Sequence, residues 1–119
     1  MFDHIGIRVR NLDAAARLYA AMLAPLGHVA GASGNGYAGF GPKGRASLWL
    51  HLSENTNNGC HVALRAESRE AVERFYAEGL KAGARDNGRP GLRTDYAPNY
   101  YAAFLIDADG NNIEAVCMK

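Results

Sequence analysis

Apolar and polar positions follow two different periods along the first part of the chain. In the segment 2–9 apolar residues alternate with polar or small ones, which predicts a strand with one buried face. From residue 12 to about residue 24 apolar residues recur every three to four positions, which predicts an amphipathic helix. Asn11 is a suitable N-cap for this helix, and Pro25 favours its end at the preceding residue.

The same succession returns later in the chain. A strand is expected at 60–66, followed by a helix at 69–82 that Ser68 caps and Gly83 ends. Shorter strands are expected at 28–30, 37–40 and 46–52 in the first half, and at 84–86, 101–106 and 112–117 in the second. The glycine- and proline-rich run 86–100 predicts a long loop. Each half then has the order βαβββ.

The two halves also match residue by residue. The segment 4–9 (HIGIRV) is similar to 61–66 (HVALRA), and the same spacing aligns Arg17 with Arg74. A register that is maintained from a strand into a helix indicates an internal duplication. We therefore expect two half-repeats, at about 1–56 and 57–119.

The length and charge of the chain limit what it can do. Its 119 residues fit a single α+β domain spanning 1–119, because half-repeats of this size are marginal alone and must share a core. A net charge of +1 provides no basic field for nucleic acid, and no apolar run approaches the roughly 18–20 residues of a membrane span. Cys60 and Cys117 form no CxxC pattern, and the N-terminus has no export signal, so we expect reduced thiols in the cytoplasm.

Three residues are candidates for holding a metal ion. His4 and His61 occupy the same position in the two halves, so a pseudo-twofold arrangement would bring them together near its axis. Glu114 lies in the last strand, on the face that alternation assigns to the open side of the sheet. Two imidazoles and one carboxylate leave positions open for a substrate on Fe, Mn, Ni or Zn. The alternative is that each histidine is a half-buried, hydrogen-bonded strand residue.

Three motifs carry a resemblance to known proteins: DHIGI at 3–7, HVA at 61–63 and DADGNNIE at 107–114. They resemble the vicinal oxygen chelate superfamily, which includes glyoxalases, bleomycin resistance proteins and extradiol dioxygenases, and the resemblance covers essentially the whole chain. It implies two βαβββ modules that form a cupped, partly closed sheet with helices outside. It also implies metal ligands at His4, His61 and Glu114, and a homodimer whose cavity lies either within one chain or between chains.

One position departs from the four ligand positions of that superfamily. Aligning Leu48 with Ile113 places Trp49 at the position equivalent to Glu114, and an indole cannot ligate a metal. His51 lies two residues further on the same face, about 7 Å along the strand, and is a conceivable substitute. The presence of Trp49 at this position disfavours the isomerisation reaction of glyoxalase I. Glyoxalase I resembles this fold, but its proton transfer depends on paired glutamates. The short chain disfavours extradiol dioxygenases.

Two classes of function remain. The first is a divalent-metal-dependent enzyme of the lyase, isomerase or thiol transferase type acting on a small oxygen-rich substrate, with Arg93 as one candidate cation for a phosphonate group. The second is a metal-free protein that binds a small molecule or confers resistance. The candidate ligand contacts are Trp49, His51, Arg93, Tyr96 and Tyr101. The long loop acts either as a lid or as packing, and no general base is assigned.

Overall fold

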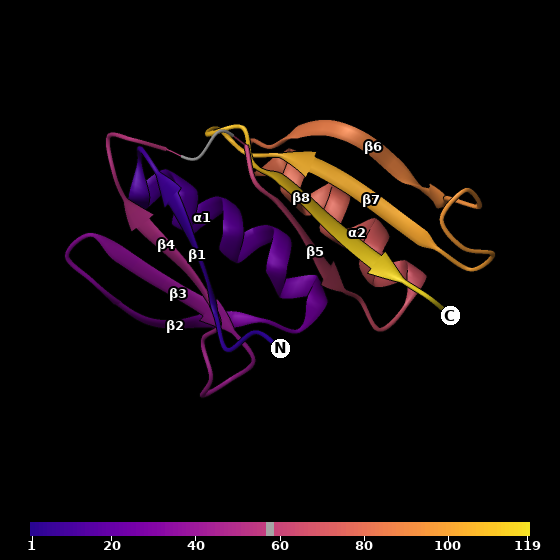
Figure 1. Cartoon of the computed structure of the whole chain (residues 1–119), viewed down its shortest axis with the longest axis horizontal. Coiled ribbons are helices and arrows are strands. Elements are labelled where there is room, and N and C mark those ends of the chain that lie inside the picture. The colour runs from indigo at the N-terminus through magenta and orange to yellow at the C-terminus, as the bar shows by residue number, and fades with distance from the viewer. Residues whose placement is uncertain (57–58) are drawn as a thin grey trace.

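The computed structural model describes residues 1–56 and 59–119 (Figure 1). The first half contains β1 (Ile5–Val9), α1 (Leu12–Leu23), the short 3₁₀ helix η1 (Ala24–Leu26), β2 (Val29–Gly34), β3 (Tyr37–Gly41) and β4 (Leu48–Leu52). The second half contains β5 (His61–Arg65), α2 (Arg69–Lys81), β6 (Arg85–Leu92), β7 (Tyr101–Ile106) and β8 (Asn112–Cys117). The order βαβββ is confirmed in each half. The boundary expected between residues 56 and 57 falls at residues outside the described part.

The described strands form two four-stranded sheets with equivalent topology. Their orders are β1-β4-β3-β2 and β5-β8-β7-β6. In each sheet the first and last strands of the half pair in parallel, and the other neighbours are antiparallel. Neither sheet closes into a barrel. The expected α+β fold, with two βαβββ half-repeats and a sheet that is not a closed barrel, is confirmed.

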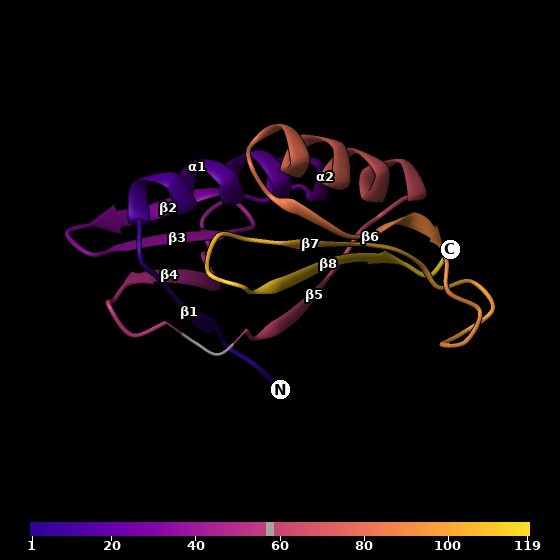
Figure 2. The same ribbon diagram turned by 90° about the horizontal axis from the view of Figure 1, so that it is seen from above.

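Helices α1 and α2 pack against each other on one side of the strands (Figure 2). Most of the strand positions that face them are apolar and buried, and Ile7 and Leu50 in the first half and Ile113 and Ala115 in the second have no exposed area. Because successive strand residues point to opposite faces, the positions between these core residues face away from the helices. That second face carries the polar and aromatic residues from which a site can be built.

Both helices begin at the residues that the sequence indicated. The Asn11 side chain accepts a hydrogen bond from the Ala14 N–H at 3.0 Å, and the Ser68 hydroxyl accepts one from the Ala71 N–H at 3.1 Å. These bonds satisfy N–H groups that a helix cannot pair within itself. Neither helix of the described residues is long and apolar enough to cross a membrane.

Two strands are longer than the sequence predicted. β2 extends to Gly34, and β6 continues to Leu92, so the expected loop 86–100 is a strand for its first part. Glycine and proline are tolerated there because β6 is an edge strand that pairs only with β7, and its register shifts twice along the way. A shorter loop of residues 93–100 then leads back to β7.

Candidate functional site

The face of the second sheet that points away from α2 carries a row of facing residues. Glu114 in the middle of β8 pairs in register with Ala63 on one side and with Phe104 on the other. Phe104 in turn pairs with Gly88 of β6. Residues that pair across a sheet point to the same side. The register therefore places the Glu114 carboxylate and the Phe104 ring next to each other on the face without a helix.

Two donors hold the Glu114 carboxylate. The His61 Nε2 atom lies 3.0 Å from Glu114 Oε2, and the Tyr100 hydroxyl donates a short hydrogen bond to Glu114 Oε1. The Glu114 side chain is only 3% exposed, whereas that of His61 is 49% exposed. A carboxylate so deeply buried is stable only when its oxygens have such partners. The His61–Glu114 pair is therefore accessible to solvent on its histidine side.

Tyr100 comes from the end of the loop 93–100, directly before β7. Burial of its phenol, together with the hydrogen bond to Glu114 and the charge of that carboxylate, raises the pKa of Tyr100 to about 12. The hydroxyl therefore stays protonated at neutral pH and acts as a donor. Tyr100 also packs edge-on against Tyr96, with ring centroids 5.1 Å apart.

The backbone sets the orientation of the His61 ring. Its Nδ1 atom lies 3.0 Å from the carbonyl oxygen of Asn112, the residue that pairs with it across the sheet. A carbonyl oxygen only accepts, so Nδ1 carries a proton and donates. The Nε2 atom then faces the Glu114 carboxylate. A buried oxygen of the Asn112 side chain has no hydrogen-bond partner within the described chain.

A cation and an aromatic ring flank this pair. The Phe104 ring is stacked near the His61 ring, with centroids 6.3 Å apart and 24° between the planes. The Arg93 guanidinium lies over the same Phe104 ring, 5.4 Å from its centroid. The second sheet thus gathers His61, Glu114, Arg93 and, through Tyr100, Tyr96.

The first sheet carries a different set of residues on its equivalent face. Trp49 pairs with Gly6 as Glu114 pairs with Ala63, so the alignment of Trp49 with Glu114 is confirmed by the strand registers. The indole packs against Gly39 of β3, where an added Cβ would approach Trp49 Cζ3 to 2.5 Å. Tyr37 packs beside it, with ring centroids 6.2 Å apart.

His51 lies on the same face as Trp49, and its ring packs over Gly6, whose absent Cβ would lie 3.3 Å from it. It therefore belongs to the first sheet and not to the His61–Glu114 pair. Tyr101 faces the helix side, where its ring contacts Arg69 and its hydroxyl meets Glu73 at 3.3 Å. The face with Glu114 does not include Tyr101.

His4 does not meet His61 within one chain, which corrects the expectation of a shared axis position. β1 and β5 run in opposite directions (Figure 1), and the backbone N–H of Arg10, after the end of β1, donates to Asp109 at 3.1 Å. Asp109 lies in the turn that precedes Asn112, and Asn112 is the strand partner of His61. The C-terminal end of β1 therefore lies near His61. His4 stands six residues earlier, roughly 20 Å away along an extended strand. The pseudo-twofold relation places equivalent strand ends apart.

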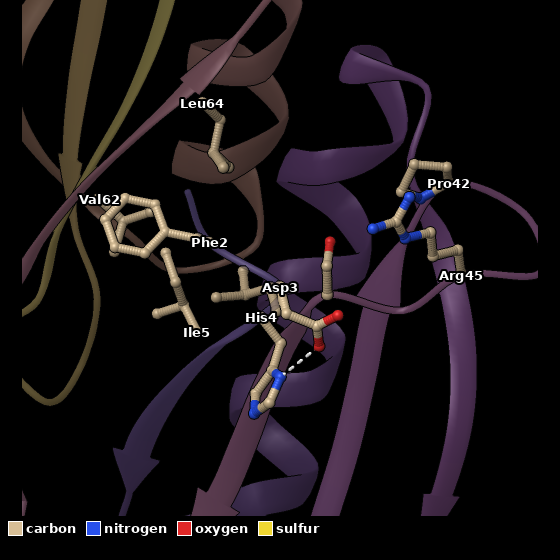
Figure 3. Close-up of a pocket in the computed structure, with 10 residues that line it drawn as sticks. Phe2, Asp3, His4, Ile5, Pro42, Arg45, Val62 and Leu64 are labelled. Atoms are coloured by element: carbon tan, nitrogen blue, oxygen red, sulfur yellow. Dashed lines mark hydrogen bonds and ion pairs between the residues drawn. The ribbon is translucent and has the colours of Figure 1, made fainter.

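His4 instead borders a cavity of about 310 Å³ where the N-terminal segment crosses towards β5 (Figure 3). Its Nδ1 atom pairs with the neighbouring Asp3 carboxylate at 2.7 Å, and this hydrogen bond lowers the pKa of Asp3. Both side chains are largely exposed. Residues 1–56 and 59–119 contain no group of three His, Cys, Asp or Glu side chains arranged to hold a metal.

Sequence reasoning did not assign Phe104 or Asn112 to the site, and it named Tyr100 only as one of several aromatic residues that could line a cavity, not as a partner of Glu114. Tyr100 directly precedes Tyr101, and residues next to each other at a strand start point to opposite faces, so choosing between them needs the strand phase. Phe104 was placed in a strand, and only its register with Glu114 reveals its role.

No protein-family model matches the chain, and no match was found among curated proteins. Solved structures, in contrast, match over nearly the full length. A glyoxalase/bleomycin resistance protein from Albidiferax ferrireducens is 25% identical with a TM-score of 0.84, and the match covers 100% of this chain and 99% of that one.

Two further structures agree on the fold. A glyoxalase/bleomycin resistance protein/dioxygenase family enzyme from Burkholderia phytofirmans is 16% identical, with a TM-score of 0.76 and 98% coverage of both chains. A glyoxalase/bleomycin resistance protein/dioxygenase from Alicyclobacillus acidocaldarius is 19% identical, with a TM-score of 0.69 and coverage of 99% and 91%. The chain therefore has the glyoxalase-like fold. This fold confirms the resemblance of its sequence to the vicinal oxygen chelate superfamily.

Proposed function

We propose that the chain is a glyoxalase-like enzyme that uses a divalent metal to act on a small oxygen-rich substrate. His61 and Glu114 supply two ligands, and His4 of a second copy supplies the third. The observation that carries the proposal is the approach of the His61 Nε2 atom to the buried Glu114 carboxylate.

The spacing of this pair suits two neighbouring ligands of one ion. Two ligand atoms bonded at about 2.1 Å and at a right angle lie about 3.0 Å apart. The His61 Nε2 and Glu114 Oε2 atoms have that separation. The Asn112 carbonyl fixes the ring through Nδ1, as a second-shell acceptor does for a ligating histidine. Tyr100 holds the other carboxylate oxygen, which leaves Oε2 for the ion.

The third ligand has to come from outside this pair. Among the described residues, the 60% exposed side chain of His4 is held only by the exposed Asp3 next to it, so another chain can approach it. A homodimer in which the first half of one copy faces the second half of the other would bring His4 to His61 and Glu114. Because Trp49 replaces a fourth ligand, an ion held there would keep positions open for substrate oxygens. A bound divalent ion polarises such oxygens as a Lewis acid.

The first prediction concerns metal binding. Metal-free protein titrated with Mn²⁺, Ni²⁺ or Zn²⁺ should bind one ion per chain, measured by calorimetry. Substitutions His61→Ala, Glu114→Gln and His4→Ala should each weaken binding at least about a hundredfold, because each removes one of three ligands. His51→Ala is the matched control, since His51 is also an exposed strand histidine and should leave affinity unchanged.

A mixed dimer tests whether the site lies between chains. A purified heterodimer of one His4→Ala chain and one Glu114→Gln chain has one site with all three ligands if the ligands come from both chains. It should bind one ion per dimer, whereas each homodimer should bind none. Binding by neither heterodimer nor wild type would refute the metal-dependent enzyme.

A metal-free binding protein on the same scaffold is the second candidate. The Trp49 indole over Gly39, with Tyr37 beside it, is an aromatic surface of the kind that binds planar ligands. Wild-type protein that takes up no metal, but whose tryptophan fluorescence responds to a planar aromatic compound, would favour this function instead.

A further inference from the structure

We propose that Arg93 forms a subsite for the carboxylate group of a small organic acid, next to the His61–Glu114 pair. This inference names the substrate class of the function proposed above and rests on that function. It depends on three features of the second sheet: the unpaired charge of Arg93, the open surface around it, and its distance from Glu114.

The Arg93 guanidinium is held in place but not neutralised. One of its terminal nitrogens donates to the Arg89 carbonyl oxygen at 2.5 Å, and the group lies over the Phe104 ring. Within residues 1–56 and 59–119 it forms no ion pair, although the side chain is half-buried. A guanidinium has five N–H donors, so most of its donors remain for an anion.

Two glycines leave the sheet surface open beneath Arg93. A Cβ at Gly88 would lie 2.8 Å from the Phe104 ring and 3.3 Å from an Arg93 nitrogen. A Cβ at Gly91 would lie 3.0 Å from the other terminal nitrogen. The guanidinium can therefore lie close to the backbone of β6, on the same face as Glu114.

The distance across the sheet limits the size of the ligand. Glu114 on β8 and Gly88 on β6 are separated by β7 alone, which corresponds to two strand spacings, or roughly 10 Å. Contact distances of about 3 Å at each end leave room for a molecule only a few atoms long. Such a molecule would place its carboxylate at Arg93 and its other oxygens at His61 and Glu114.

A single guanidinium suits a monocarboxylate. A guanidinium and a carboxylate form two parallel hydrogen bonds and balance one charge against one. The Phe104 ring beside Arg93 adds an apolar wall for a short carbon chain.

Calorimetric titration with lactate tests the subsite, with lactamide as the neutral analogue and inorganic phosphate as the dianion. Metal-loaded wild-type protein should bind lactate in preference to both. Arg93→Gln should weaken lactate binding roughly tenfold to a hundredfold, as expected for a lost charge-assisted bidentate contact, and Arg93→Lys should recover part of it. Arg89→Gln is the matched control, because Arg89 lies four residues earlier, on β6, but its side chain interacts with Tyr76 on the helix side.

Each outcome of these titrations supports or refutes either the Arg93 subsite or the metal-dependent function. Equal lactate affinity in wild type and Arg93→Gln, with metal binding intact, refutes the subsite and leaves the proposed function standing. Lactate binding that depends on Arg93 in a protein that takes up no metal supports the subsite and refutes the metal-dependent function. Phosphate binding tighter than lactate binding refutes the carboxylate class. Thermal unfolding at the wild-type temperature in both arginine variants excludes misfolding as the cause.

Discussion

A single residue position distinguishes the two halves at the site. Glu114 and Trp49 occupy equivalent registers, yet Glu114 is a buried carboxylate with two donors, whereas Trp49 is an indole that packs against Gly39. The sequence alone indicated that the two positions are equivalent. It also indicated that Glu114 needs partners, because a buried carboxylate in an apolar strand is unstable without them. It did not indicate which partners, since Tyr100 reaches Glu114 from a loop fourteen residues away.

His28 provides a test of pH dependence at this scale. Burial lowers the pKa of His28 below its ordinary value of 6.5, and its buried Nδ1 atom has no partner in the described part of the chain. Because the folded state resists protonation, the unfolded state binds more protons as pH falls through 6.5, and stability is lost there.

Urea unfolding of wild type and His28→Leu should therefore differ more at pH 5 than at pH 8. At pH 5 the leucine variant should be the more stable, because the unfolded wild-type chain takes up a proton on His28 there and the unfolded variant has no imidazole to protonate. A difference that is the same at both pH values would contradict this account.

At the scale of elements, the helices followed their sequence signals closely, and the edge strands did not. Helix caps are local, so Asn11 and Ser68 alone determine where α1 and α2 begin. A strand such as β6 forms because it pairs with a neighbouring strand, here β7. The glycine and proline in its sequence favour a loop and therefore do not indicate this pairing. Close packing of helix on sheet depends on single small residues, of which Gly79 in α2 is the clearest case.

Gly79→Ala should destabilise the protein by roughly 1–3 kcal/mol, because the added Cβ would lie 2.3 Å from the buried Leu105 Cδ1 atom. Helix propensity alone predicts the opposite sign, a gain of about 1 kcal/mol. Ala77→Gly on the exposed side of the same helix measures that propensity term. Thermal or urea unfolding of both variants separates the effects, and a stabilised Gly79→Ala protein would show that the packing argument is wrong.

At the scale of the whole molecule, the two halves are held together by a shared core and by one buried polar contact. The Tyr19 hydroxyl of α1 donates to the Asp107 carboxylate at 2.6 Å, and Asp107 also accepts from the backbone N–H groups of Asp109 and Asn111. Burial and the neighbouring Asp107 charge raise the pKa of Tyr19, so its hydroxyl remains a donor.

Tyr19→Phe should lower the free energy of unfolding by about 1.5–3 kcal/mol, because it leaves a buried carboxylate oxygen with one donor fewer. Tyr101→Phe is the control, since its hydroxyl meets Glu73 at the surface and its loss should cost less than about 0.5 kcal/mol. Equal losses in the two variants would mean that the contact between the halves adds nothing beyond a surface hydrogen bond.

The sequence by itself determined the duplicated βαβββ order, the helix limits, the face of Glu114 and the equivalence of Trp49 with it, because these depend on periodicity, capping and internal repetition. Only the tertiary structure decided that Tyr100, Phe104 and Arg93 join His61 around Glu114, and that His4 does not. The physical reason is that alternation fixes which face a side chain takes, whereas the direction in which two strands cross the molecule fixes which ends meet. β1 and β5 run in opposite directions, so equal positions in the two halves lie at opposite ends.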